Sequence, residues 1–167
     1  MLSIGKSGLS QLRFTSFYLV DESLTPAIAR ALYLCGYDIV FARDLDEFKG
    51  KDLVSDEEIV EWLGGHGRQK SVWITADKDA AKAHAKFIIS KQNSVIWVFR
   101  PKTGLSSLHE LILISLIIEH VNDLITNAGS PLYLRASFLK GKKAKLERLV
   151  SPLTQRHLQW KRIPLPK

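Results

Sequence analysis

Short apolar runs alternate with longer, more polar segments along the chain. Five of these runs are four or five residues long and rich in branched or aromatic side chains: 17–20, 37–41, 72–75, 95–99 and 132–136. Runs of this length and composition are typical of buried strands. Because helical segments separate them, the pattern predicts an α/β fold, a three-layer α/β/α sandwich with a mostly parallel central sheet.

Helices are predicted between the runs from their caps and their periodicity. Thr25 and Pro26 supply an N-cap and a first-turn proline. Ser55 and Glu58 match a capping box, in which each residue caps the backbone of the other. Four helices are expected: residues 27–35, the segment that begins after Ser55, about 80–89 and about 107–128.

Charge is divided unevenly along the chain, whose formal net charge is +7. Residues 135–167 hold ten lysine or arginine residues and one acid, whereas the other 134 residues hold 14 basic and 16 acidic residues. We therefore expect an N-terminal extension (1–16), a folded domain (17–138) and a basic C-terminal tail (139–167). The tail is expected either to meet a polyanion or an acidic protein surface, or to be solvated and partly disordered.

Cysteine content and hydropathy bear on the compartment in which the protein works. The only cysteine, Cys35, excludes an intramolecular disulfide, and we expect it to be a buried apolar residue. No secretory signal is apparent in residues 1–16. The longest uncharged run of the most apolar helix, 111–118, has eight residues, against the roughly 18 needed to span a bilayer. The protein is therefore expected to be cytoplasmic, with no membrane-spanning segment.

Acidic side chains follow two of the predicted strands. Asp21 comes directly after the first strand, and Asp77 and Asp79 come after the third. Carboxyl ends of parallel strands meet at one edge of a sheet, where α/β proteins bind ligands. Asp56 lies in the first turn of a helix, where its charge suits the dipole. Because gathered carboxylates repel one another and a divalent cation relieves that repulsion, the pattern predicts a Mg²⁺ or Mn²⁺ pocket for phosphoryl chemistry.

Some of these acids also have a purely structural interpretation. Asp56 would then only match the helix dipole, and Asp79 would be the N-cap of the following helix. Asp21 and Asp77 are harder to explain in this way, because each follows an apolar strand at its carboxyl end.

Basic residues offer candidate contacts for a phosphate backbone. Arg43 and Lys78 lie near the acids in sequence and are candidates to hold a phosphate, unless they are solvated surface charges. Trp160 lies beside Lys161 and Arg162 in the predicted tail. This combination suits base stacking beside phosphate contacts, and docking of the ring on the protein's own body is the alternative.

Four segments occur in an order that resembles the PIN-like family and, within it, the compact toxins of VapC type. They are residues 17–24 (FYLVDESL), 36–40 (GYDIV), 55–59 (SDEEI) and 74–79 (ITADKD). The resemblance covers roughly residues 17–100. It implies a PIN-like fold, Mg²⁺-dependent endoribonuclease activity on RNA and, for a toxin, a cognate antitoxin protein as partner.

The resemblance also assigns roles to single residues. The metal ligands would be Asp21, Asp77 and Asp79. The helix acid would be Asp56 or its neighbour Glu57, and Thr75 would brace the site by hydrogen bonding.

Two other functions fit parts of the sequence. Residues 21–25 match the D-x-x-x-T pattern of haloacid-dehalogenase-type phosphatases, but Ser23 stands where such enzymes need a second carboxylate. A non-catalytic module is the other alternative, in which the acids are structural and the tail binds nucleic acid or a protein.

The helix expected over about 107–128 is apolar on more than one face. A helix of this kind is buried or lies in an interface. We therefore expect it to contribute to a homodimer or to an antitoxin-binding groove.

Overall fold

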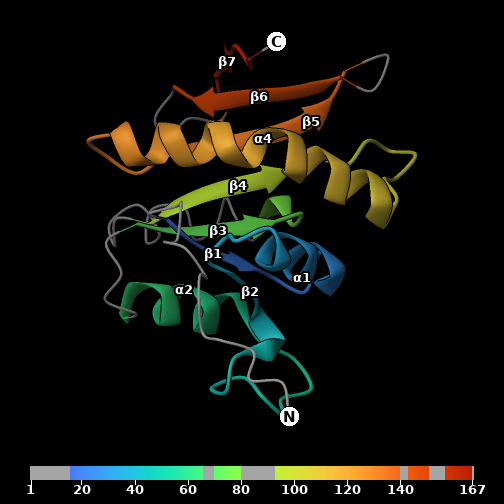
Figure 1. The fold of residues 1–167 in the computed structure, drawn as a ribbon, viewed down its shortest axis with the longest axis vertical. Coiled ribbons are helices and arrows are strands. Elements are labelled where there is room, and N and C mark those ends of the chain that lie inside the picture. Colours follow the sequence, from blue (N-terminus) through green and yellow to red (C-terminus); the bar gives the residue numbers. More distant parts are fainter. Residues whose placement is uncertain (1–15, 66–69, 80–92, 140–142, 151–156, 167) are drawn as a thin grey trace, which may run out of the picture.

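Seven strands form a single sheet in the computed structural model, which describes residues 16–65, 70–79, 93–139, 143–150 and 157–166. The strands are β1 (Phe17–Val20), β2 (Ile39–Phe41), β3 (Ser71–Thr75), β4 (Ser94–Val98), β5 (Tyr133–Phe138), β6 (Ala144–Leu149) and β7 (Trp160–Ile163). Figure 1 shows them rising in the order β2-β1-β3-β4-β5-β6-β7 from the bottom of the view to the top. Neighbours from β2 to β5 are parallel, whereas β6 and β7 pair in antiparallel fashion. The predicted α/β fold with a mostly parallel sheet is therefore confirmed.

Helices pack on both faces of the sheet. They are α1 (Pro26–Leu34), the short 3-10 helix η1 (Ala42–Asp44), α2 (Asp56–Gly65) and α4 (Ser107–Asn127). Side chains alternate along β1, so that Tyr18 and Val20 join the apolar core beneath α1 and α4. Phe17 and Leu19 join a second core beneath α2. The result is an arrangement in three layers; the helix predicted over about 80–89 lies outside the described residues.

Local capping signals account for where α1 and α2 begin. Thr25 caps α1, since its hydroxyl oxygen accepts a hydrogen bond from the backbone N–H of Ala27 at 3.4 Å. The Ser55 N–H donates to Glu58 Oε2 at 2.9 Å, and the Glu58 N–H donates to Ser55 Oγ at 3.3 Å. These reciprocal bonds form the predicted capping box. After α1 the chain turns at Gly36, whose φ of 93° lies in the region that favours glycine.

Strands β6 and β7 are absent from the sequence-based expectations. Charged side chains, including Lys145 and Glu147, hide the apolar pattern of β6. The structure compensates this charge across the sheet, because Arg135 of β5 lies opposite Glu147 and donates from Nε to Glu147 Oε2 at 2.8 Å. The described part of residues 139–167 therefore continues the sheet, and the charge boundary near Phe138 is not a boundary of the fold.

Helix α4 is apolar on two sides. One side is buried against the sheet and α1, through Leu113, Ile114, Ile117, Ile118, Val121 and Ile125. The other side leaves Leu108 63 % exposed, Ile112 41 % and Leu116 57 %. Across the described segments, no helix has the length and apolarity needed to cross a membrane.

The prediction that Cys35 is buried is wrong, because this residue is exposed. Helix α1 ends at Leu34, and Cys35 caps it where the chain turns away from the core. The buried face of α1 consists of Ile28, Ala29 and Leu32. Helical periodicity alone placed Cys35 on this face, one turn beyond Leu32, where the helix no longer continues.

Candidate active site

Strands β1 and β3 create a topological switch point in the sheet. The chain leaves β1 to form β2 on one side and returns to form β3 on the other. Val20 pairs with Ile74, so the residues that follow them, Asp21 and Thr75, come side by side at the carboxyl ends. Ligands of open α/β sheets bind at such switch points, and this position makes the edge the leading candidate for a functional site.

Asp21 is buried at this edge and held by hydrogen bonds. Its side chain is 4 % exposed. Oδ1 accepts hydrogen bonds from the Ser23 N–H, at 2.9 Å, and from the Ser23 hydroxyl. Oδ2 accepts one from Trp73 Nε1 at 3.0 Å. Burial raises the pKa of Asp21, and the hydrogen bonds from Ser23 and Trp73 oppose that rise.

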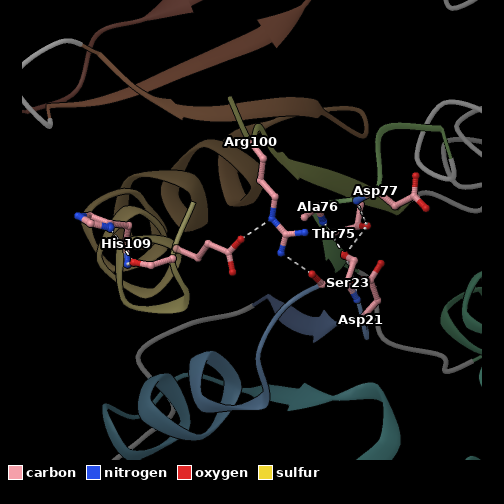
Figure 2. Close-up of polar contacts among 9 residues, drawn as sticks. Asp21, Ser23, Thr75, Ala76, Asp77, Arg100 and His109 are labelled. Atoms are coloured by element: carbon pink, nitrogen blue, oxygen red, sulfur yellow. Dashed lines mark hydrogen bonds and ion pairs between the residues drawn. The ribbon is translucent and has the colours of Figure 1, made fainter. Parts of the chain in front are cut away.

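Ser23 links the two strand ends. Its hydroxyl binds Asp21, accepts a hydrogen bond from the Ala76 N–H at 2.7 Å, and lies 3.3 Å from Thr75 Oγ1. Thr75 Oγ1 in turn accepts a bond from the Asp77 N–H at 3.0 Å. Figure 2 shows this chain of contacts from Asp21 to Asp77. The backbone that carries Asp77 is therefore fixed relative to Asp21.

Asp77 follows β3 directly before a helical segment, Asp79 lies in the first turn of that segment, and both are exposed. Asp77 Oδ1 accepts a hydrogen bond from the Asp79 N–H at 2.8 Å. This contact matches an N-cap, because the side chain of an N-cap residue accepts a hydrogen bond from the backbone N–H of the second or third residue of the helix. Asp77 therefore takes the capping role that had been considered for Asp79.

The four predicted acids do not form one cluster. Asp56 is the first residue of α2 and is partly exposed, as its first-turn position implies. Among the residues that the structure describes, no group of three or more His, Cys, Asp or Glu side chains is arranged to hold a metal ion. The structure thus links Asp21, Thr75 and Asp77 through hydrogen bonds at one edge of the sheet.

Arg43 lies at the same edge but is engaged by an acid. Its Nε donates to Glu22 Oε1 at 2.6 Å, and its Nη2 donates to Glu22 Oε2 at 3.0 Å and to the Asp52 carbonyl oxygen at 2.5 Å. This two-pronged contact neutralises much of the charge that a phosphate would need. Lys78, the other basic candidate, is exposed beside Asp77.

Arg100 is a site residue that sequence reasoning passed over. It follows β4, and its Nη2 donates to the Ser23 carbonyl oxygen at 2.5 Å. Its Nε donates at 2.5 Å to Oε1 of Glu110, whose side chain is 2 % exposed in the first turn of α4. Figure 2 shows Arg100 approaching Ser23 from one side, with Asp77 on the other. The position of Arg100 after an apolar strand, at the same edge as Asp21, was the available signal.

Comparison with known proteins adds no assignment. No protein-family model matches the chain, and no curated protein is significantly similar to it in sequence.

The side chains at this edge suit a hard cation in their chemistry. Carboxylate oxygens are the ligands that Mg²⁺ prefers, and Mg²⁺ is commonly held by one or two carboxylates together with water and substrate phosphates. Both oxygens of Asp21 already accept hydrogen bonds, and Asp77, whose Oδ1 accepts from the Asp79 N–H, is exposed at the edge of the site. This donor set fits an ion shared with a bound substrate better than an ion enclosed by protein alone.

Proposed function

We propose that the protein is a PIN-like, Mg²⁺- or Mn²⁺-dependent endoribonuclease that hydrolyses RNA phosphodiesters, and that it is the toxin of a toxin–antitoxin pair. The observation that supports this most is the position of Asp21 and Asp77 at the carboxyl ends of adjacent parallel strands, at the switch point of the sheet. The order of the four resembling segments agrees with it. The proposed cellular site is the cytoplasm.

In this proposal Asp21 and Asp77 hold the ion, and Asp79 completes the acidic turn. When bound, the ion would neutralise charge on the phosphate and activate a water molecule. Ser23 and Trp73 orient Asp21, and Thr75 orients the backbone of Asp77. Loss of such an orienting contact typically lowers metal affinity or activity by about 10- to 100-fold.

The direct test is the substitution Asp77→Asn in a cleavage assay with total RNA and Mn²⁺ or Mg²⁺. Asparagine keeps the oxygen that accepts the Asp79 N–H but removes the charge. We expect cleavage to fall at least about 100-fold, because losing a ligand should cost no less than losing a group that orients one. The melting temperature should stay within about 2 °C, since Asp77 is exposed.

The matched control is Asp46→Asn, which removes an equal charge from an exposed turn far from β3 in sequence. Asp46→Asn should cleave RNA like the wild type, and EDTA should abolish cleavage by the wild type and by Asp46→Asn. Undiminished cleavage by Asp77→Asn would remove the mechanism.

A non-catalytic module is the second candidate, and one observation favours it. Asp21 is buried with both oxygens in hydrogen bonds, and burial raises its pKa, which is also what a structural carboxyl group would show. This candidate predicts RNA binding that EDTA does not change, with no cleavage at any metal concentration.

The partner in this proposal is a cognate antitoxin protein, with a homodimer as the alternative. The exposed apolar residues Leu108, Ile112 and Leu116 recur every fourth residue on α4 and form one stripe. Light scattering on the purified protein separates the two: a dimer supports self-association, whereas a monomer leaves the stripe for another protein.

A further inference from the structure

A pocket lies beside the candidate active site, reached through Lys78, and has a different chemistry. Its volume is about 300 Å³, at the lower end of the roughly 300–1,000 Å³ that is usual for ligand sites. The described residues that line it include four aromatic rings and two cations: Trp97, Phe99, Tyr133, Trp160, Lys78 and Arg135. We call it the aromatic pocket.

The rings of the aromatic pocket form a continuous cluster. The centroid of Trp160 lies 6.0 Å from that of Trp97 and 5.7 Å from that of Tyr133. Trp97 meets Phe99 edge to face, with centroids 5.6 Å apart. Trp160 therefore docks on the protein's own body, and β7 presents it next to two rings from the central sheet. Phe99 remains 40 % exposed and offers a free ring surface at the rim.

Arg135 is fixed inside this cluster. Its guanidinium lies 4.4 Å from the Trp160 ring centroid, within the range of a cation–π contact. Glu147, opposite Arg135 in the β5–β6 register, accepts from Arg135 Nη2 at 2.6 Å. The positive charge is therefore held in place by a buried carboxylate before any ligand binds.

The lining of the aromatic pocket reaches the edge of the sheet that carries the acids. Lys78 directly follows Asp77 after β3, and Phe99 directly follows the neighbouring strand β4. Trp97 and Tyr133 belong to the core on the α2 side, so the pocket continues from the strand ends onto that face. A chain of nucleotides that crosses the acids would pass this pocket next.

We propose that the aromatic pocket binds an unpaired base of single-stranded RNA, with Lys78 contacting an adjacent phosphate. Aromatic rings beside cations are the features by which proteins hold single strands, because every base has a face that can stack. The inference rests on the proposed function, since it supplies the subsite for a nucleotide next to the one cleaved, but its test needs no cleavage.

The test measures binding of a fluorescently labelled 12-nucleotide single-stranded RNA to the full-length protein by anisotropy in EDTA. Phe99→Leu keeps an apolar side chain but removes the ring, and should weaken binding at least about fivefold. The control Tyr33→Leu removes a 66 % exposed ring from α1, on the other face of the sheet, and should bind like the wild type. Equal affinities of the two variants, or no binding by the wild type, would overturn the inference.

A second variant tests the phosphate contact. Lys78→Gln should weaken binding and reduce the slope of log affinity against log salt by about 0.7, the value for one phosphate contact to a single strand. The control Lys49→Gln removes an exposed charge elsewhere and should leave the slope unchanged. An unchanged slope for Lys78→Gln would contradict the phosphate contact, and a mononucleotide that competes as strongly as the oligonucleotide would contradict RNA as the ligand.

These results separate this inference from the proposed function. If Phe99→Leu weakens RNA binding but the wild type never cleaves RNA, the aromatic pocket stands and the nuclease proposal fails. If Asp77→Asn abolishes cleavage while Phe99→Leu binds normally, the nuclease proposal stands and the aromatic pocket fails.

Discussion

At the scale of single residues, the candidate site depends on how Asp21 is held. Its carboxylate lies under the strand ends, where Ser23 and Trp73 donate hydrogen bonds to it. These bonds favour the charged form, whereas burial disfavours it and has the larger effect on the pKa. A buried carboxyl group with a raised pKa gains from an approaching cation, because the cation offsets the cost of ionisation.

The pH dependence of stability tests this description of Asp21. Because burial raises its pKa in the folded state, the folded protein binds the proton more tightly than the unfolded chain. The stability that Asp21 contributes is therefore present at low pH and falls as pH rises through the folded pKa. Asparagine does not titrate, so the unfolding free energy of Asp21→Asn relative to wild type should increase between about pH 4 and 7.

Urea unfolding in EDTA at each pH measures this difference. The readout is how the difference in unfolding free energy between Asp21→Asn and the wild type changes with pH. The absolute value of this difference also depends on the lost charge and on a changed hydrogen bond. A relative stability of Asp21→Asn that decreases toward neutral pH would show that the hydrogen bonds outweigh burial and that the pKa of Asp21 is not raised.

At the scale of secondary-structure elements, ion pairs join the last strands to the sheet. Glu147 of β6 accepts hydrogen bonds from Arg135 of β5 and, at 2.7 Å, forms an ion pair with Lys145 of its own strand. Burial by itself would raise the pKa of Glu147, but these contacts outweigh it and lower the pKa. Glu147 therefore contributes stability above its unfolded pKa, and that contribution is lost as pH falls through the folded pKa.

Replacing Glu147 measures the strength of this connection. Glu147→Gln should lower the unfolding free energy by about 1–3 kcal/mol near neutral pH, because it removes the buried negative charge with which Arg135 and Lys145 pair. The loss should shrink as the pH falls below about 4, where the wild-type carboxylate also becomes neutral. Glu61→Gln, an exposed change on α2, should stay within about 0.5 kcal/mol in the same urea titration. A loss that persists in acid would indicate a packing defect and not a charge effect.

The elements that could be predicted from the sequence are those with a local signal. Strand β1 is a pure apolar run, and α1 and α2 carry their own caps at Thr25 and Ser55. Strand β6 has no such signal, because the pairing of its Glu147 with Arg135 of β5 is made by the folded sheet and cannot be read from the sequence of β6 itself. Cys35 was misplaced for the opposite reason: helical periodicity extended past the point where α1 ends.

At the scale of the whole molecule, the basic C-terminal segment is part of the folded sheet. Leu146 of β6 is fully buried, and Trp160 of β7 packs on Trp97 and Tyr133. The positive charge of this region is therefore presented on the sheet and next to the aromatic pocket. The carboxyl-end location of Asp21 and Asp77 followed from strand order in the sequence, whereas Ser23 and Arg100 required the pairing of strands to be known.

Removing residues 139–167 should consequently damage the fold. The truncation exposes the edge of β5 and removes the burial of Leu146 and Trp160, worth about 4 kcal/mol together. We expect the melting temperature to fall by at least about 8 °C, measured by circular dichroism. The double variant Lys161→Gln/Arg162→Gln removes two exposed charges without cutting the sheet and should melt like the wild type. A truncated protein as stable as the full chain would contradict the structural role.

If Asp21 and Asp77 form a divalent-cation site at the switch point of the sheet, Mn²⁺ titration followed by NMR will locate the ion there. Bound Mn²⁺ broadens nearby resonances, so the amides of Ser23, Ala76 and Asp77 should broaden first in the wild type. Asp77→Asn should abolish this broadening at the same Mn²⁺ concentration. Broadening that is centred on α2, or that survives in Asp77→Asn, would show that Asp21 and Asp77 do not form the cation site.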